Sequence, residues 1–150
     1  MKLHRALYLA AAVLALAAAS ATHAQTSVAV VAVRGTVSGS PESVLFSGEA
    51  RVQNRLAPDP DFNSPNYVLT IDLTGVSGVG ALSQKKYVIS GPEIVQKKVA
   101  LLHVVDITFP FQEAGTAALN ARGGVASFTL GFDAQGTITS AVGSIDTPSF

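Results

Sequence analysis

The stretch Val44–Leu56 reads VLFSGEARVQNRL and alternates apolar and polar residues with a period close to two. Successive side chains of a β-strand point to opposite faces, so this pattern predicts a strand with one buried face. All 13 glycines and all 7 prolines lie beyond residue 34, and they interrupt the apolar runs often. Long helices therefore have little room, and the chain is expected to be mostly β.

Further strands are predicted on both sides of this stretch. The same alternation occurs over Tyr67–Leu73 and over Val95–Phe111, and the valine-rich segment Val28–Val37 is typical of a first strand. The sequence Gly-Ser-Pro at residues 39–41 should end that first strand. Pro110 has no N–H to donate to a ladder, so we expect the end of its strand to lie at a sheet edge or a bulge.

The clearest hairpin is predicted near the end of the chain. Two β-like runs, Val125–Phe132 and Thr137–Ile145, flank Asp-Ala-Gln-Gly at residues 133–136. Aspartate suits the start of a type I turn, and Gly136 can supply the positive φ that lets the strands resume pairing.

Three other segments are rich in residues that break regular structure. Ala57–Asn66 contains three prolines, and Gly75–Gly80 repeats glycine, so both are predicted to be loops. Gly115–Gly124 could be a loop or could form one or two helical turns. With six to eight strands at regular spacing, we expect a single all-β domain, a small antiparallel β-sandwich, with a small closed β-barrel as the alternative.

The first 24 residues have the pattern of a cleaved signal peptide. Lys2 and Arg5 precede an apolar run of 14 residues, Ala6–Ala19, which is shorter than the roughly 20 residues that a membrane-spanning helix needs. Small residues place the cleavage site after Ala24, with Ala21 as a competing site. The prediction is therefore a leader at residues 1–24 and one exported domain at residues 25–150, periplasmic or extracellular and not membrane-spanning after processing.

The composition of that domain excludes several functions. It retains eight Lys and Arg against ten Asp and Glu, a formal charge of −2. It therefore lacks the excess of basic residues that is typical of nucleic-acid-binding domains. Cysteine is absent, which excludes disulfides and thiol chemistry. Its 126 residues are enough to bury a core without such cross-links.

His103 is the single histidine that follows the leader, so any serine-type triad would depend on it. Its parity places it on the apolar face of the strand predicted over Val95–Phe111, whereas Asp106 falls on the opposite face. The two side chains should not meet, and we interpret His103 as a core or cross-strand residue. A zinc site would need several His or Cys ligands, which this domain lacks.

Asp59, Asp61 and Asn63 have the alternating spacing with which a calcium-binding loop begins. The match ends there, because Ser64 stands where such a loop has glycine and Thr70 stands where it has glutamate. A polar, proline-rich turn is the simpler interpretation. The sequence therefore nominates no catalytic residue, no cofactor and no metal ligand.

The near-repeat of QKKYV at residues 84–88 and QKKV at residues 96–99 gathers four lysines around a Ser-Gly-Pro-Glu turn. Symmetric pairing across that turn would place Lys86 opposite Lys97 and Lys85 opposite Lys98, and like charges across a ladder are unfavourable. An anionic ligand, such as lipid head groups, an acidic glycan or an acidic partner, would compensate. The simpler interpretation is that these lysines protect an exposed edge from aggregation.

These observations rank three candidate functions for the domain. A non-enzymatic binding or structural module, with an unknown protein, glycan or lipid partner, comes first. A subunit of a surface assembly comes second, with Val28–Val33 donated to a neighbour's sheet. An enzyme that depends on carboxylates comes third, and the sequence alone leaves open whether any catalytic activity exists.

Overall fold

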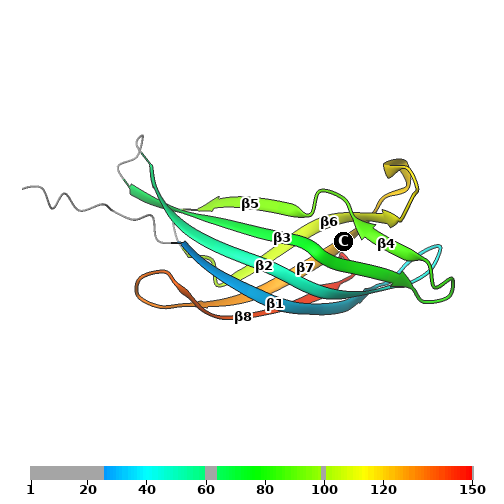
Figure 1. Ribbon diagram of the computed structural model, residues 1–150, viewed down its shortest axis with the longest axis horizontal. Coiled ribbons are helices and arrows are strands. Elements are labelled where there is room, and N and C mark those ends of the chain that lie inside the picture. Colours follow the sequence, from blue (N-terminus) through cyan, green and yellow to red (C-terminus); the bar gives the residue numbers. More distant parts are fainter. Residues whose placement is uncertain (1–25, 60–63, 99–100, 150) are drawn as a thin grey trace, which may run out of the picture.

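The computed structural model describes residues 26–59, 64–98 and 101–149, so the predicted leader lies outside the described residues. Eight strands and one short 3-10 helix, η1, make up its regular structure (Figure 1). In chain order they are β1 Thr26–Val37, β2 Val44–Asp59, β3 Ser64–Gly80, β4 Lys86–Ile89, β5 Glu93–Lys98, β6 Val104–Glu113, η1 Ala118–Asn120, β7 Arg122–Phe132 and β8 Ile138–Asp146.

Seven of the strands close into a barrel. They are hydrogen-bonded in the order β2-β1-β8-β7-β6-β4-β3, and β3 pairs back with β2 to complete the ring, while β5 lies beside β3. The predicted β-sandwich is therefore wrong, and the alternative of a small closed barrel is confirmed. Alternation could not separate the two folds, because both bury one face of every strand.

Closure depends on contacts between residues far apart in the chain. β1 and β8 run parallel and meet where Gly35 lies opposite Ile145. A Cβ atom at Gly35 would lie 1.7 Å from the carbonyl oxygen of Ile145, so no other residue fits this approach. The pairing joins the first strand to the last, and no local pattern in the sequence signals it.

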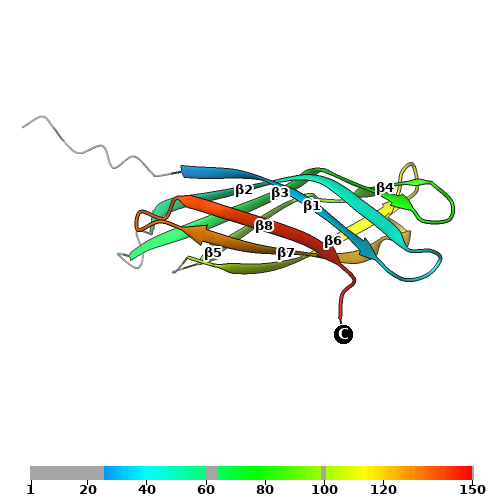
Figure 2. The same cartoon turned by 90° about the horizontal axis from the view of Figure 1, so that it is seen from below.

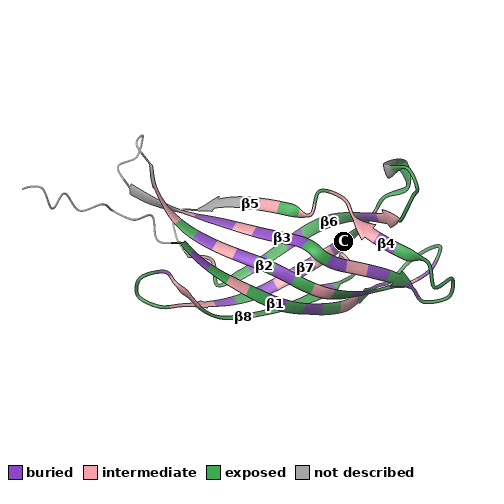
Figure 3. Cartoon of the chain, in the orientation of Figure 1, coloured by how far each residue is buried: buried purple, intermediate pink, exposed green. Residues whose placement is uncertain are grey.

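The interior of the barrel is a packed core rather than a channel. Inward residues alternate with exposed ones along the strands, as the banding in Figure 3 shows. Aromatic rings fill one half of the interior: Phe46 packs edge-on against Phe109 and Phe111, with ring centroids 5.6 Å and 4.9 Å away. Aliphatic side chains dominate the other half, including those of Val52, Ile71, Leu69 and Leu130.

Most predicted strands are confirmed. Val28–Val37 falls within β1, Val44–Leu56 within β2 and Tyr67–Leu73 within β3. The hairpin is also confirmed: β7 and β8 pair antiparallel, the N–H of Asp133 donates to the carbonyl of Thr137, and Gly136 has a φ of 80°.

Strands extend into both predicted loops. Residues 75–80 form the end of β3 and pair with β2, so the prediction of a loop there is wrong. A Cβ atom at Gly78 would lie 2.6 Å from Val44 and 2.9 Å from Phe46, which shows that this glycine makes room for core side chains rather than for a turn. β2 and β3 also continue to pair through residues 57–59 and 64–66, inside the other predicted loop.

The strand predicted over Val95–Phe111 is two strands, β5 and β6, in different places. β5 pairs with β3, whereas β6 pairs with β7 along most of its length and with β4 at its end. Residues 101–103 continue the apolar alternation and contain no turn former, so the sequence hides the break. Pro110 lies on β6 next to the point where pairing with β4 begins, in agreement with the predicted sheet edge.

Three connections gather at one end of the barrel, the right-hand end in Figures 1 and 2. They are residues 38–43 between β1 and β2, residues 81–85 between β3 and β4, and residues 114–121 between β6 and β7. The turn between β7 and β8 lies at the opposite end (Figure 2). Within the described ranges, no helix combines the length and hydropathy required to cross a bilayer.

Candidate functional site

The three connections at the right-hand end enclose two adjoining pockets that share Pro41, Tyr87 and Glu113. The larger, about 440 Å³, extends towards η1, and the smaller, about 280 Å³, extends towards the β3–β4 turn. The larger is also lined by Ser40, Thr116, Asn120, Ala121 and Arg122, and the smaller by Glu42, Leu82, Ser83 and Lys85.

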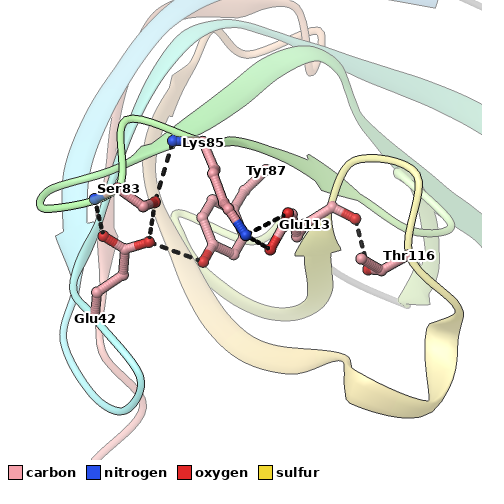
Figure 4. A network of polar contacts seen from close by, with 6 residues as sticks. All are labelled: Glu42, Ser83, Lys85, Tyr87, Glu113 and Thr116. Carbon is pink, nitrogen blue, oxygen red and sulfur yellow. Dashed lines mark hydrogen bonds and ion pairs between the residues drawn. The ribbon is translucent and has the colours of Figure 1, made fainter.

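Glu42 is the centre of the polar network beside these pockets (Figure 4). Its carboxylate accepts hydrogen bonds from the N–H groups of Leu82 and Ser83 at 2.8 Å and 2.9 Å, from the Ser83 hydroxyl, and from the Tyr87 hydroxyl at 3.1 Å. The Ser83 hydroxyl, followed by the amides of Ser83 and Leu82, holds the pKa of Glu42 at about 2, against its usual 4.5. Glu42 is therefore a fixed, ionised acceptor that ties the β3–β4 turn to the β1–β2 loop.

Tyr87 fixes the other side of that carboxylate. Its side chain is buried, and its ring packs edge-on against Phe111 with centroids 6.0 Å apart. Burial, and then the hydrogen bond to Glu42, raises the pKa of the Tyr87 hydroxyl. Tyr87 thus stays protonated at neutral pH and acts as a donor.

Two cations complete the network. The Lys85 ammonium lies 2.9 Å from one carboxylate oxygen of Glu113 and 3.0 Å from the other, which joins the β3–β4 turn to the end of β6. The hydrogen bond and charge of Glu113 raise the pKa of Lys85. Arg122 donates to the backbone carbonyl of Glu42 at 2.8 Å, and its guanidinium lies 5.1 Å from the centre of the Phe111 ring.

This arrangement is suited to holding shape rather than to moving protons. A general base near neutral pH needs a carboxylate with a raised pKa or a histidine within reach of the reacting group. The pKa of Glu42 moves the other way, and Glu113 is paired with Lys85. The side chains of Ser40 and Asn120, in contrast, make no hydrogen bond within the described part of the chain and face the larger pocket.

His103 lies far from this site. It precedes β6, at the end of that strand remote from Glu113, and its ring is exposed rather than in the core. Its Nδ1 atom is 3.1 Å from the carbonyl oxygen of Leu130, and its ring packs edge-on against Phe132 at 5.5 Å. The sequence left a core or a cross-strand position open: the core position is wrong, since His103 is exposed and precedes the first residue of β6, whereas its contacts with Leu130 and Phe132 of β7 are cross-strand. The ring nitrogen nonetheless has a partner, and Asp106 lies on the outer face of β6.

The predicted lysine pairs across a hairpin are wrong. β4 and β5 do not pair with each other: they follow one another along β3, where Lys86 lies opposite Val79, Lys97 opposite Val68 and Lys98 opposite Tyr67. Lys85 forms its ion pair with Glu113 instead. The side chains of Lys97 and Lys98 lie outside those described, so an anionic ligand at the four lysines stays a prediction.

The calcium-like spacing cannot be followed in space, since Asp61 and Asn63 lie outside the described residues. Among the residues that are described, no three His, Asp or Glu side chains are placed to share a metal ion.

Of the residues that build the two pockets, sequence reasoning singled out Lys85 but missed the others. Glu42, Tyr87 and Arg122 are separated by about 40 residues each, and none belongs to a motif. The one available signal was the break at residues 39–41, which places Glu42 beside a loop. Comparison of the chain with protein-family models, with curated proteins and with solved structures gives no match.

Proposed function

We propose that this chain is an exported, non-enzymatic binding module that holds a neutral polar ligand, such as part of a glycan, in the pocket at the barrel end. The observation that supports this proposal is that the carboxylates beside the pocket already have hydrogen-bond or ion-pair partners. Glu42 is saturated with hydrogen bonds, and Lys85 neutralises Glu113. A ligand would therefore meet uncharged hydroxyl and amide groups beside a hydrogen-bonded carboxylate, an ion pair, and the Arg122 guanidinium held by the Glu42 carbonyl and the Phe111 ring.

The larger pocket has the size and polarity for a small hydroxyl-rich group. Its volume is about 440 Å³, within the usual range of ligand sites. Ser40 and Asn120 offer both donors and acceptors along its wall, whereas the Thr116 hydroxyl already donates to the Glu113 carbonyl. Uncharged polyols bind through such groups, and the Arg122 guanidinium, for which no ion pair is found among the described residues, can also donate to their hydroxyl oxygens.

Binding can be tested by titrating the mature protein with a panel of neutral oligosaccharides, by calorimetry and thermal shift. Asn120→Ala should weaken binding about five- to tenfold, the cost of one hydrogen bond. Ser47→Ala is the matched control, since Ser47 is exposed on β2 and does not line the pocket. Absence of binding across the panel, or equal binding by Asn120→Ala, would contradict the proposal.

The same incubations distinguish the remaining functions. Cleaved oligosaccharides, detected by mass spectrometry, would favour the carboxylate-dependent enzyme. Strand donation by Val28–Val33 would require β1 to leave β2, with which all twelve of its residues pair, and also β8. A monomer in the exported fraction would count against that assembly.

Export itself is tested by the mass and N-terminal sequence of the processed protein. Cleavage after Ala24 leaves Gln25 as the first residue, and cleavage after Ala21 leaves Thr22. Full-length chain in the cytosol would contradict export.

A further inference from the structure

The wall of the barrel is incompletely hydrogen-bonded between β5 and β6. β6 pairs with β7 over residues 104–111 but with β4 only over residues 111–113. β5 pairs with β3 along residues 93–98 and with no other described strand. Figure 1 shows β5 running apart from β6 over this part of the barrel.

The direction of the backbone groups on β6 follows from the bonds at its two ends. The carbonyl of Pro110 accepts from the N–H of Ser90, and the N–H of Ala114 donates to the carbonyl of Lys86. The backbone N–H and carbonyl groups of even-numbered residues therefore point away from β7. The carbonyl of His103 accepts from the N–H of Leu130 on β7, so the backbone N–H and carbonyl groups of odd-numbered residues point towards β7. In an antiparallel ladder this alternation continues along the strand.

Val104, Asp106 and Thr108 therefore direct their N–H and carbonyl groups towards β5, a strand with which β6 does not pair. Their side chains are exposed on the outer face, Val104 to 66%. A row of unpaired backbone groups is a template for a further strand. Pro110 ends the template, because it has no N–H and its carbonyl is already bonded.

The charge at the centre of this row decides between partners. A second copy pairing antiparallel across a two-fold axis centred on residue 106 would place Asp106 opposite Asp106, which is unfavourable. Asp106 makes no ion pair within the described residues, and its neighbour across the ladder on β7 is the uncharged Ser127. A basic residue at that position of an added strand would complement it.

We propose that residues 104–108 of β6 form a docking edge for an extended segment of another protein, with a lysine or arginine opposite Asp106. The backbone of the partner completes the ladder, and the charge sets its register. This interaction surface is separate from the pocket at the barrel end and does not depend on the ligand proposed there.

The test uses the full mature chain and the capped peptide Thr-Val-Thr-Lys-Thr-Val-Thr, followed by amide NMR. Saturable shifts and slowed hydrogen exchange should appear at Val104, Asp106 and Thr108 at a peptide concentration of about 1 mM or below. The same peptide with glutamate in place of lysine should bind at least about fivefold more weakly, and Asp106→Lys should reverse that preference.

A backbone variant separates strand addition from simple charge attraction. Thr108→Pro removes one N–H on the open side without removing a bond to β7, so it should weaken binding about five- to tenfold. Thr108→Val is the matched control, since it keeps the N–H and the β-branched shape. If Thr108→Pro does not fold, N-methylation of the peptide on its bonding side removes a ladder bond from the partner instead.

Several outcomes would overturn the proposal. They are the absence of shifts at residues 104–108, binding that ignores the N–H deletions, and self-association that is lost in Thr108→Pro. The last would identify a second copy of this chain as the occupant. If the protein binds the peptide but none of the oligosaccharides, the proposal of a pocket ligand is contradicted and the proposal of a docking edge on β6 is supported.

Discussion

The two ends of the barrel are closed by different means. At the pocket end, Glu42 of the β1–β2 loop is bonded to the β3–β4 turn and to Tyr87 of β4, and its carboxylate accepts bonds from residues about 40 positions away. At the other end, the β7–β8 turn closes through its own backbone and the Asp133 carboxylate, and Asn54 donates a single bond to the Gly136 carbonyl at 2.8 Å. The comparison shows that local sequence can build one end, whereas the other exists only once the barrel has closed.

The aromatic core below the pocket end should give the largest effect. Phe46→Ala removes a fully enclosed ring that packs on Phe109 and Phe111, and it should cost about 3–5 kcal/mol of unfolding free energy. Phe46→Leu fills most of the space and should cost clearly less. Urea unfolding followed by circular dichroism measures both, and equal losses would show that the edge-on ring contacts, rather than the volume that the side chain fills, carry the stability.

The opposite end should depend on one buried amide. Asn54→Ala leaves the Gly136 carbonyl without its donor and should cost about 1–3 kcal/mol. Asn54→Asp is the informative partner variant, because it keeps the shape but loses the donor. If Asn54→Ala is as stable as the wild type, the turn is held by its own backbone alone.

The accuracy of the sequence predictions follows the same division. The Asp133–Gly136 hairpin and the strands around Phe46 were predictable, because a turn motif and period-two burial are local signals. Barrel closure through Gly35 and Ile145 was not, since a sandwich would show the same alternation. The pocket was also missed, because Glu42 and Arg122 become neighbours only through the folded order of β1, β8 and β7.

Acid should loosen the pocket end before the opposite end. The pKa of Glu42 is about 2 in the folded chain and 4.5 ordinarily, so its contribution to stability is present above pH 4.5 and is lost as the pH falls towards 2. Amide hydrogen exchange at Leu82 and Ser83 should therefore accelerate over that range, relative to Gly136. Glu42→Gln, which cannot ionise, should remove this pH dependence, and unchanged acceleration in that variant would contradict the assignment.

The smallest effect is expected from the exposed ion pair at the rim of the pocket. Lys85 is 57% exposed and Glu113 34%, so water and salt screen their attraction and little of it reaches the unfolding free energy. Lys85→Gln should lower the urea midpoint slightly more than Lys86→Gln, a matched variant of the neighbouring lysine, for which no ion pair is found among the described residues. The difference should disappear in about 1 M salt, where charges are screened within about 3 Å. A larger loss that persists in salt would mean that Lys85 supports the pocket through packing of its side chain, and the pocket end would then depend on more than the buried network around Glu42.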